Sequence, residues 1–468
     1  MSNNQSTVSR RSFLSNAAII GASGTLGAGS LLTACSGGSK EIKYTPLRPA
    51  SECYIPELGD KAIDGKPLKV AVIGCGRRGT GAATNLLDAA DGISFVACAD
   101  AFKDNLDIFR ERMKKVKNID IADDKCFVGF DAYKKACETD ADLVIIASPQ
   151  LFHPDHLKYA IEKGKHVFCE KPAAADPTGF RTFMLAVRQA QAKGLCIVPG
   201  THKHYHRGYI EAYKLVQEGY IGRITSANVW FCQGGGIGRV KRLPGWTDME
   251  FMLRDFFNWY WVSGDHVVDQ FVHAIDIFNW FSHSRPERAL AVGSRQRRYS
   301  GNCYDNFAID YEYPGGVMVR GMARQIEKCD NRVAETIIGT RGIFNAVNEG
   351  KELNIHDLDG NLVWQYDHEA AKEKFQQHNP YVLEHVDLVN NIRRGTVVNN
   401  AEIIANSTMA CIMARESAYT GKFSTWDEMS QSDMNFMPAD FTLHNVDRSQ
   451  YMVPAPAGAP IQHANWQI

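Results

Sequence analysis

The sequence predicts an α/β protein that begins with a parallel, doubly wound sheet, and three observations carry this prediction. An uninterrupted apolar run at residues 70–73 leads into three closely spaced glycines and then into a helix. A second apolar run at 93–99 ends in an acid, and further apolar runs alternate with helical stretches up to residue 200. Strands of parallel sheets are covered on both faces and therefore lack polar alternation, and alternation with helices is typical of doubly wound folds.

The glycines Gly74, Gly76 and Gly79 have the G-x-G-x-x-G spacing of a dinucleotide-binding turn. The first allows the tight turn, the second lets the backbone approach a pyrophosphate, and the third lets the helix pack closely on the strand. Free N–H groups at the start of the helix would hold the phosphates. Arg77 and Arg78 are candidates for further pyrophosphate contacts, with solvated side chains as the alternative interpretation.

The second apolar run ends in Asp100. A carboxylate about 20 residues after the last glycine would accept hydrogen bonds from the adenosine ribose. Because an acid repels a 2′-phosphate, we expect NAD as the cofactor, with NADP less favoured. Lys103 lies close by and weakens that preference.

The first 35 residues resemble an export signal and are excluded from the fold. The pair Arg10-Arg11 precedes a weakly apolar run that ends in Leu32-Thr33-Ala34-Cys35, which is similar to a bacterial lipobox. A transmembrane helix is the poorer alternative, because residues 17–34 are rich in Gly, Ser and Thr. We therefore expect an exported, periplasmic protein attached to the membrane only through a lipid on Cys35. Residues 36–65 would be a tether and lead-in.

The composition excludes some functions. The 52 basic and 53 acidic residues nearly cancel, and no basic tract follows the leader, which argues against nucleic acid as a partner. The 12 cysteines form no C-x-x-C pair, and several lie in predicted strands. We interpret most of them as buried small hydrophobes and expect neither zinc nor a disulfide framework.

Residues 66–200 complete the predicted nucleotide domain. Helices are expected at 103–117 and 131–137, and strands at 141–149, 166–169 and 195–200. Within this part, Ser148-Pro149, His153 and the segment Glu170-Lys171-Pro172 resemble the Gfo/Idh/MocA oxidoreductases. The resemblance implies a Rossmann domain paired with an open-faced mixed sheet. It also implies that Ser148, Pro149, His153, Glu170 and Lys171 border the cofactor.

Lys171 is the expected catalytic lysine, which in the family touches both nicotinamide and substrate. It follows a parallel strand, and the carboxyl ends of such strands are where ligands of open α/β sheets bind. A cation beside a reacting hydroxyl stabilises the alkoxide and can pass on its proton. The alternative interpretation is a surface lysine at the end of a strand.

A second domain is expected over residues 201–426. His202, His204 and His206 alternate, so they would share one face of an extended segment. No carboxylate or cysteine with ligand spacing adjoins them, so we expect no metal. In the family this crossing borders the substrate, which implies that His204 and His206 contact sugar hydroxyls.

An irregular segment after the predicted strand at 224–231 contains Trp246, Arg254, Trp259 and Tyr260. Aromatic faces stack on pyranose rings, and arginine donates to hydroxyls. We interpret this cluster as part of a carbohydrate pocket, with Arg254, Trp259 and Tyr260 as substrate contacts. Buried core aromatics are the alternative.

A helix is expected over residues 265–280, on which Asp265, Asp269, His273 and Asp276 would line one face of a polar cleft. A solvated outer face is the alternative. The spacing resembles the family signature G-G-x-x-x-D-x-x-x-H-x-x-D, with Asp265 in place of a glycine. The resemblance implies that His273 contacts the reacting hydroxyl and Asp269 a neighbouring one.

Antiparallel strands with Gly turns are expected at 311–319 and 336–344, in keeping with an α+β domain built on an open-faced, predominantly antiparallel mixed sheet. Helices at 379–394 and 400–420 would close this domain. Residues 427–468 read as a C-terminal arm whose Pro- and Ala-rich part, 453–460, could pack on a neighbouring subunit. We therefore expect a homo-oligomer, either a dimer or a tetramer.

These features predict an NAD-dependent oxidoreductase that acts on a secondary hydroxyl of a sugar, glycoside or cyclitol. The periplasm offers no free NAD pool, so we expect NAD to stay tightly bound and to be recycled in each turnover. One alternative is a glycoside-cleaving enzyme that works by oxidation and elimination through a 3-keto intermediate. The other is a non-catalytic sugar-binding lipoprotein.

Overall fold

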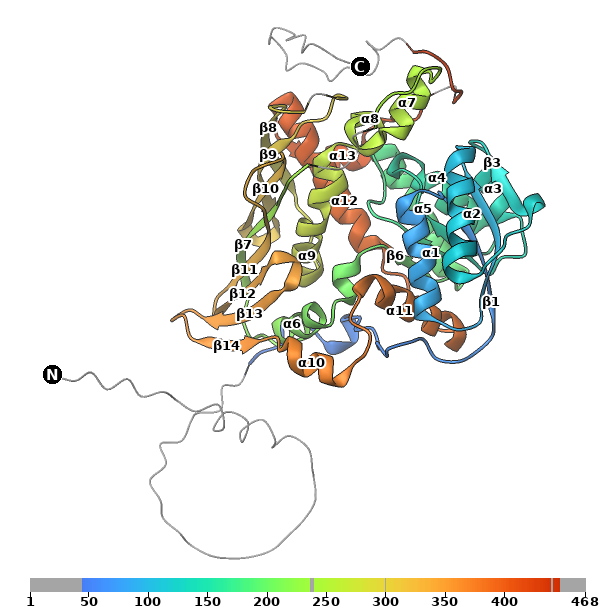
Figure 1. Ribbon diagram of the computed structural model, residues 1–468. Coiled ribbons are helices and arrows are strands. Elements are labelled where there is room, and N and C mark those ends of the chain that lie inside the picture. Colours follow the sequence, from blue (N-terminus) through green and yellow to red (C-terminus); the bar gives the residue numbers. More distant parts are fainter. Residues whose placement is uncertain (1–43, 236–239, 299, 439–440, 447–468) are drawn as a thin grey trace, which may run out of the picture. The chain divides into compact units, whose positions relative to one another are not determined.

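The computed structural model describes residues 44–235, 240–298, 300–438 and 441–446 (Figure 1). The predicted export signal, the lipid site at Cys35 and the extended segment at 453–460 lie outside the described residues. The described chain holds two β-sheets, each with its own helices.

The first sheet has six strands, all parallel, in the order β3-β2-β1-β4-β5-β6. Apolar runs form its central strands, as predicted. The short edge strand β3 was not predicted. Alternate residues of β1 join different cores, so the sheet is covered on both faces. Its strands are β1 (Leu68–Ile73), β2 (Ile93–Asp100), β3 (Cys126–Val128), β4 (Leu143–Ile146), β5 (His166–Cys169) and β6 (Ile197–Pro199). Its helices are α1 (Arg77–Ala89), α2 (Lys103–Lys117), α3 (Ala132–Cys137), α4 (His153–Glu162) and α5 (Pro177–Ala192).

The second sheet has nine strands in the order β14-β13-β12-β11-β7-β10-β9-β8-β15. Only β7 and β10 pair in parallel, so the sheet is mixed and mainly antiparallel, as expected. The strands are β7 (Ile224–Gln233), β8 (Arg288–Ser294), β9 (Asn306–Tyr313), β10 (Val317–Gln325), β11 (Arg332–Gly339), β12 (Gly342–Val347), β13 (Glu352–Asp357), β14 (Leu362–Gln365) and β15 (Ser424–Thr425).

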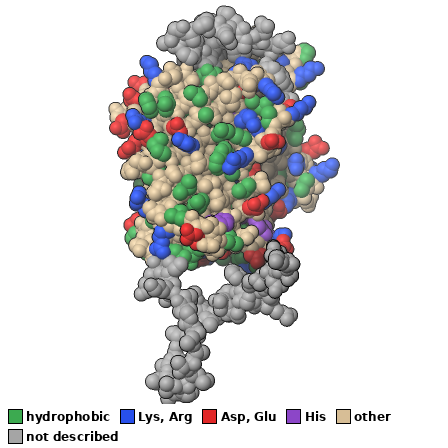
Figure 2. All heavy atoms as spheres, turned by 90° about the vertical axis from the view of Figure 1, so that its left-hand side faces the viewer, with side chains coloured by type: hydrophobic (Ala, Val, Ile, Leu, Met, Phe, Trp, Pro, Cys, Tyr) green, Lys and Arg blue, Asp and Glu red, His purple; other side chains and the backbone are tan. Residues whose placement is uncertain are grey.

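Helices cover only one face of this second sheet (Figure 1). The opposite face is open, and Figure 2 shows apolar and charged side chains interspersed on it. The α-helices after residue 200 are α6 (Arg207–Gln217), α7 (Asp248–Arg254), α8 (Tyr260–Ser263), α9 (Val272–Ser282), α10 (His368–Lys374), α11 (Pro380–Arg394), α12 (Ala401–Thr420) and α13 (Trp426–Gln431). Short 3-10 and π turns are η1 (Ala50–Glu52), η2 (Asp123–Lys125), η3 (Gln150–Phe152), η4 (His202–Tyr205), η5 (Phe256–Asn258), η6 (Val267–Phe271), η7 (Pro314–Gly316) and η8 (Asn348–Gly350).

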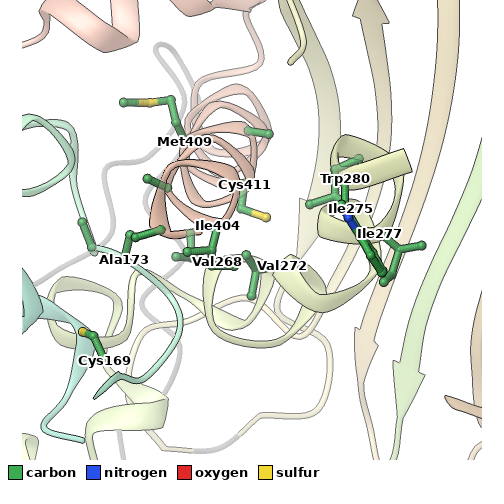
Figure 3. Close-up of a cluster of buried hydrophobic side chains, with 14 of the residues drawn as sticks. Cys169, Ala173, Val268, Val272, Ile275, Ile277, Trp280, Ile404, Met409 and Cys411 are labelled. Atoms are coloured by element: carbon green, nitrogen blue, oxygen red, sulfur yellow. The ribbon is translucent and has the colours of Figure 1, made fainter. Parts of the chain in front are cut away.

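Two late helices tie the sheets together. Helix α12 packs among α9, α5 and β8, and Figure 3 shows its Ile404 and Cys411 near Val268 and Val272. Helix α11 differs from expectation: it does not close the second domain but packs on α1, and its Val386 joins the core under β1. Residues 380–394 therefore pack on the nucleotide domain.

The described cysteines, from position 53 to 411, are free thiols and most are buried, in line with their interpretation as small hydrophobes. Within the described ranges, no helix has the length and apolar character needed to cross a membrane.

Candidate functional site

The glycine turn lies where β1 ends and α1 begins. Gly74 has a φ of 89°, and a Cβ there would lie 2.6 Å from the backbone of Ala147. A Cβ on Gly79 would lie 1.8 Å from the carbonyl oxygen of Gly74. A Cβ on Gly76 would meet no atom within 4 Å, and no side chain caps the helix that follows. The turn therefore leaves open space and free helix N–H groups for a phosphate.

A cavity of about 280 Å³ opens beside this turn. It is lined by Gly74, Gly76, Asp100, Ser148 and Pro149, among others. The Asp100 carboxylate also braces the turn, because its oxygens accept hydrogen bonds from the backbone N–H of Cys75 at 2.7 Å and of Phe102 at 2.8 Å. Burial raises the pKa of Asp100 above its ordinary value. Five of the predicted cofactor residues thus gather around one cavity.

His153 is buried and clamps two turns together. Its Nδ1 lies 2.7 Å from the carbonyl oxygen of Pro172, and its Nε2 lies 2.7 Å from that of Ser148. Burial lowers the pKa of His153. Both ring nitrogens are committed to the chain, so the structure gives His153 a positioning role beside the cofactor cavity.

The two arginines of the turn behave differently. Arg77 is exposed and makes no hydrogen bond or ion pair among the described residues. The Arg78 guanidinium donates to Glu170 and, at 3.2 Å, to Glu384 of α11. Burial raises the pKa of Glu384 well above its ordinary value, against the opposing effect of Arg78. Arg78 therefore joins the glycine turn to Glu170 and α11. Of the two arginines, Arg77 is the one whose side chain is available to a phosphate.

Lys171 follows β5 and meets the turn η6. Its Nζ donates to the backbone carbonyl of Asp269 at 2.5 Å and lies 3.8 Å from the Asp269 carboxylate. That carboxylate also accepts hydrogen bonds from the side-chain amides of Gln150 at 3.1 Å and Gln270 at 2.6 Å. Only 13% of the Lys171 side chain and 7% of the Asp269 side chain are exposed. The ammonium is thus fixed in a nearly closed environment where its charge acts strongly.

His273 is in the first turn of α9, four residues after Asp269. Its ring packs edge-on against His202, with centroids 5.1 Å apart, and lies over Phe231. No hydrogen bond from the described residues occupies its ring nitrogens. Burial, followed by the charge of Lys171, holds the pKa of His273 well below its ordinary value. The ring is therefore neutral at pH 7 and can accept a proton from a substrate hydroxyl.

The helix predicted over 265–280 is not continuous. Asp265 has a φ of 80°, and the π-helical turn η6 precedes α9, so the expected single polar face is wrong. The Asp265 carboxylate accepts hydrogen bonds from the N–H of Tyr304 at 2.9 Å and from the hydroxyl of Tyr419. Burial raises the pKa of Asp265 to about 6. Asp265, at the family's glycine position, therefore has a structural role.

Asp276 is also paired within the chain. Its carboxylate pairs with His204 Nε2 at 2.7 Å and accepts from the hydroxyl of Ser407 at 2.8 Å. The His204 ring stacks on Trp280, with centroids 4.2 Å apart. Of the four residues predicted on one face, the structure brings only Asp269 and His273 toward Lys171.

The three alternating histidines do not share a face, because residues 202–205 form the 3-10 turn η4 rather than a strand. His204 is the buried partner just described. His206 accepts a hydrogen bond from the N–H of Gly208 at 3.2 Å and caps α6. The histidine that reaches His273 is His202, whose ring stacks on Tyr381 with centroids 4.4 Å apart. Both His202 and Tyr381 were missed as site residues. His202 is one of the three alternating histidines, whereas nothing in the sequence signals Tyr381.

The aromatic segment belongs to the core. Trp259 and Tyr260 are 4% and 9% exposed, and the Tyr260 hydroxyl donates to Glu416 at 2.7 Å. Arg254 lines the cavity beside the glycine turn. Trp259 and Tyr260 are therefore core residues, and Arg254 belongs to the cavity beside the glycine turn. No group of three or more His, Cys, Asp or Glu side chains suited to a metal ion occurs among the residues that the structure describes.

Strand order 3-2-1-4-5-6, a glycine turn at the switch point and a lysine at the end of β5 define a dinucleotide-binding protein with a second, mixed-sheet domain. Residues 68–200 match the family model described as "Oxidoreductase family, NAD-binding Rossmann fold", and residues 209–345 match the "GFO/IDH/MocA C-terminal domain". The chain belongs to the GFO/IDH/MocA oxidoreductase family, and its first domain is an NAD-binding Rossmann domain.

Three curated relatives show different chemistries. A 2,7-anhydro-N-acetylneuraminate hydratase of Escherichia coli is 27% identical over 37% of this chain and 43% of its own length. Glycosyl hydrolase family 109 protein 1 of Bacteroides thetaiotaomicron is 34% identical over 28% of this chain and 27% of its own. An inositol 2-dehydrogenase of Rhodococcus jostii is 24% identical over 40% of this chain and 46% of its own. The chain thus matches less than half the length of each of these relatives.

One solved structure is a scyllo-inositol dehydrogenase of Lactobacillus casei with bound NAD(H) and scyllo-inositol. It has a TM-score of 0.58 and 21% identity, and the match covers 77% of this chain and 99% of that one. At this identity the likeness supports the fold.

Proposed function

We propose that the protein is an NAD-dependent oxidoreductase acting on a secondary hydroxyl of a sugar, glycoside or cyclitol. The observation that carries the proposal is the juxtaposition of Lys171, Asp269 and a neutral His273 at the end of β5. An inositol 2-dehydrogenase among the relatives supports a polyhydroxylated ring as substrate.

The residues of the turn fit the cofactor. Gly76 leaves space for a pyrophosphate, and Asp100, Ser148 and Pro149 line the cavity that would take the adenosine end. When bound, NAD supplies a hydride acceptor at nicotinamide C4. Lys171, fixed through Asp269, would lie on the nicotinamide side.

Proton handling then falls to residues of this chain. His273 accepts the proton of the substrate hydroxyl because its ring is neutral and its nitrogens are uncommitted. The Lys171 ammonium stabilises the negative charge that develops on the oxygen. Asp269 holds Lys171 and orients a neighbouring hydroxyl.

We propose further that the protein is exported to the periplasm and held by a lipid on Cys35, which the Arg10-Arg11 pair and the lipobox-like tetrapeptide support. In that compartment NAD would be retained and recycled within each turnover. The proposed oligomer would form through the open face of the second sheet (Figure 2), where Leu290, Val292 and Met322 are exposed.

A glycoside-cleaving activity is the second candidate, favoured by the likeness to family 109 glycosyl hydrolases. Oxidation at C3 would acidify the C2 proton, loss of that proton would expel the anomeric substituent, and addition of water and return of the hydride would complete the cycle. A sugar-binding protein without catalysis is the third, and it leaves the uncommitted His273 without a role.

One experiment separates the three. The purified protein is denatured and the released NAD is quantified, and the native protein is incubated with a panel of glucosides and cyclitols. Keto products support the oxidoreductase, released aglycone supports cleavage, and neither product with any compound supports simple binding.

A further inference from the structure

Part of the second domain reaches the cofactor cavity. Leu253 and Arg254 of α7, and Phe256 of η5, line the same cavity as Gly74 and Asp100. The two groups are more than 150 positions apart in the sequence. The segment 248–258 therefore forms one wall of a cavity whose other walls belong to the Rossmann domain.

Arg254 fastens this wall to the Rossmann domain. Its Nη1 and Nη2 donate to the two carboxylate oxygens of Asp104, in the first turn of α2, at 2.9 and 3.1 Å. Its Nε donates to Glu250 of α7 at 3.0 Å. The guanidinium also lies over the ring of Phe102, 3.9 Å from its centroid.

All three of these hydrogen bonds go to carboxylates of the chain, and they use three of the five N–H donors of Arg254. Two carboxylates, of Asp104 and Glu250, neutralise its charge, so it is poorly suited to binding an anion such as a 2′-phosphate. What the contacts do is hold α7 against α2 and Phe102. A planar two-point pair of this kind fixes orientation as well as distance.

The cavity that the wall closes suits a flat aromatic base. Several of its lining side chains carry rings, and Asp100 and Asn105 add polar groups. Its ring-bearing lining residues are Phe102, Phe130, Tyr133, Phe152, His156 and Phe256. Aromatic walls stack favourably on such a base.

We propose that Arg254 and Asp104 form a latch that closes α7 over the adenosine end of NAD and slows its release. The inference rests on the proposed function, since it supplies the retention that a periplasmic, recycling enzyme needs. Arg254 is then a cofactor-retaining residue.

The test measures the rate at which the dinucleotide leaves the full-length protein. The protein is loaded with NADH, excess NAD is added, and the release of NADH is followed over time. Arg254→Ala should speed release about tenfold, because it removes the ion pair and the stacked cation together. Asp104→Ala removes the ion pair alone and should speed release by about two- to fivefold. The double variant should release no faster than Arg254→Ala, because the contact that Asp104→Ala breaks is already lost when Arg254 is absent. Arg242→Ala is the matched control, since Arg242 pairs with Asp248 of the same segment at 2.7 Å but does not line the cavity.

Asp104 is 56% exposed, so its substitution leaves the fold intact, which a thermal melt verifies. Unchanged release in Asp104→Ala would overturn the latch. If the wild-type protein is purified without bound NAD, the proposed retention of NAD is wrong. The latch would still predict that Arg254→Ala releases added NADH about tenfold faster than the wild type. Keto-product formation by the wild type judges the proposed function separately.

Discussion

The Gly76→Ala substitution separates cofactor binding from folding, because the added methyl meets no protein atom within 4 Å. Gly76 is the N-cap of α1, and a Gly to Ala change at such a position costs about 1 kcal/mol or less. For a chain of this size that lowers the melting temperature by only about 2 °C. The apo protein should therefore fold normally.

Cofactor affinity should fall much more. The methyl would stand where the pyrophosphate approaches the free N–H groups of α1, and a lost hydrogen bond to a charged group costs about 1.5–3 kcal/mol. That corresponds to a roughly 10- to 150-fold increase in the Kd for NAD. Titration of NADH fluorescence measures the Kd, and calorimetry measures the melting temperature.

Gly81→Ala is the control, one turn further along α1, where a Cβ would make an ordinary contact with Arg78 at 3.4 Å. It should leave the Kd unchanged and the helix slightly more stable. The reasoning is refuted if Gly76→Ala binds NADH like the wild type while melting normally.

The remaining predictions concern single side chains. Lys171→Met should lower kcat by about 10²- to 10⁴-fold with NAD retention unchanged, as measured by steady-state kinetics and NAD release, and near-normal kcat would remove Lys171 from the chemistry. His206→Ala, which removes the cap of α6 and the packing of the ring on Tyr209, should lower the melting temperature without changing kcat/KM, and a raised KM would restore His206 as a substrate contact. His385 is fully buried with both ring nitrogens unpartnered, and burial holds its pKa well below the ordinary value. Stability should therefore fall as pH drops below about 6.5, where only the unfolded chain takes up that proton. Between pH 6.5 and 5 the free energy of unfolding should therefore fall by about 2 kcal/mol less in His385→Phe than in the wild type, as measured by denaturant unfolding. An equal pH dependence in both proteins would contradict this role of His385.

The sequence was most informative at positions where the residue type is compatible with only one local structure. The apolar run of β1 and the glycines at 74 and 79 admit few alternatives, because a side chain at either glycine would clash with backbone. The strand β3 was missed because three residues carry too little pattern.

Site prediction failed where it assumed uniform geometry. A regular helix would place Asp265, Asp269, His273 and Asp276 in one row, but a left-handed residue and a π-helical turn break the row. Likewise, the three histidines were expected to alternate along a strand, but residues 202–205 form a 3-10 turn. As a result His202, and not His204, lies against His273.

Long-range contacts were beyond the reach of local pattern. Nothing near Arg254 in the sequence indicates that its partner is Asp104, and nothing near Tyr381 indicates that it stacks on His202. Trp259 and Tyr260 are residue types that are common in sugar-binding sites, but the same rings also pack well in a hydrophobic core, where the structure places them.

Transfer of deuterium from a substrate carbon to the cofactor is the direct signature of the proposed hydride transfer. The purified protein is mixed with cyclitols and glucosides that carry deuterium on their ring carbons and is quenched within the first turnover, before the hydride is returned. The protein-bound nicotinamide is then analysed by mass spectrometry. An oxidoreductase built on Lys171, Asp269 and His273 should place one deuterium on nicotinamide C4, and Lys171→Met should not. Bound NAD that stays unlabelled with every compound would contradict the account.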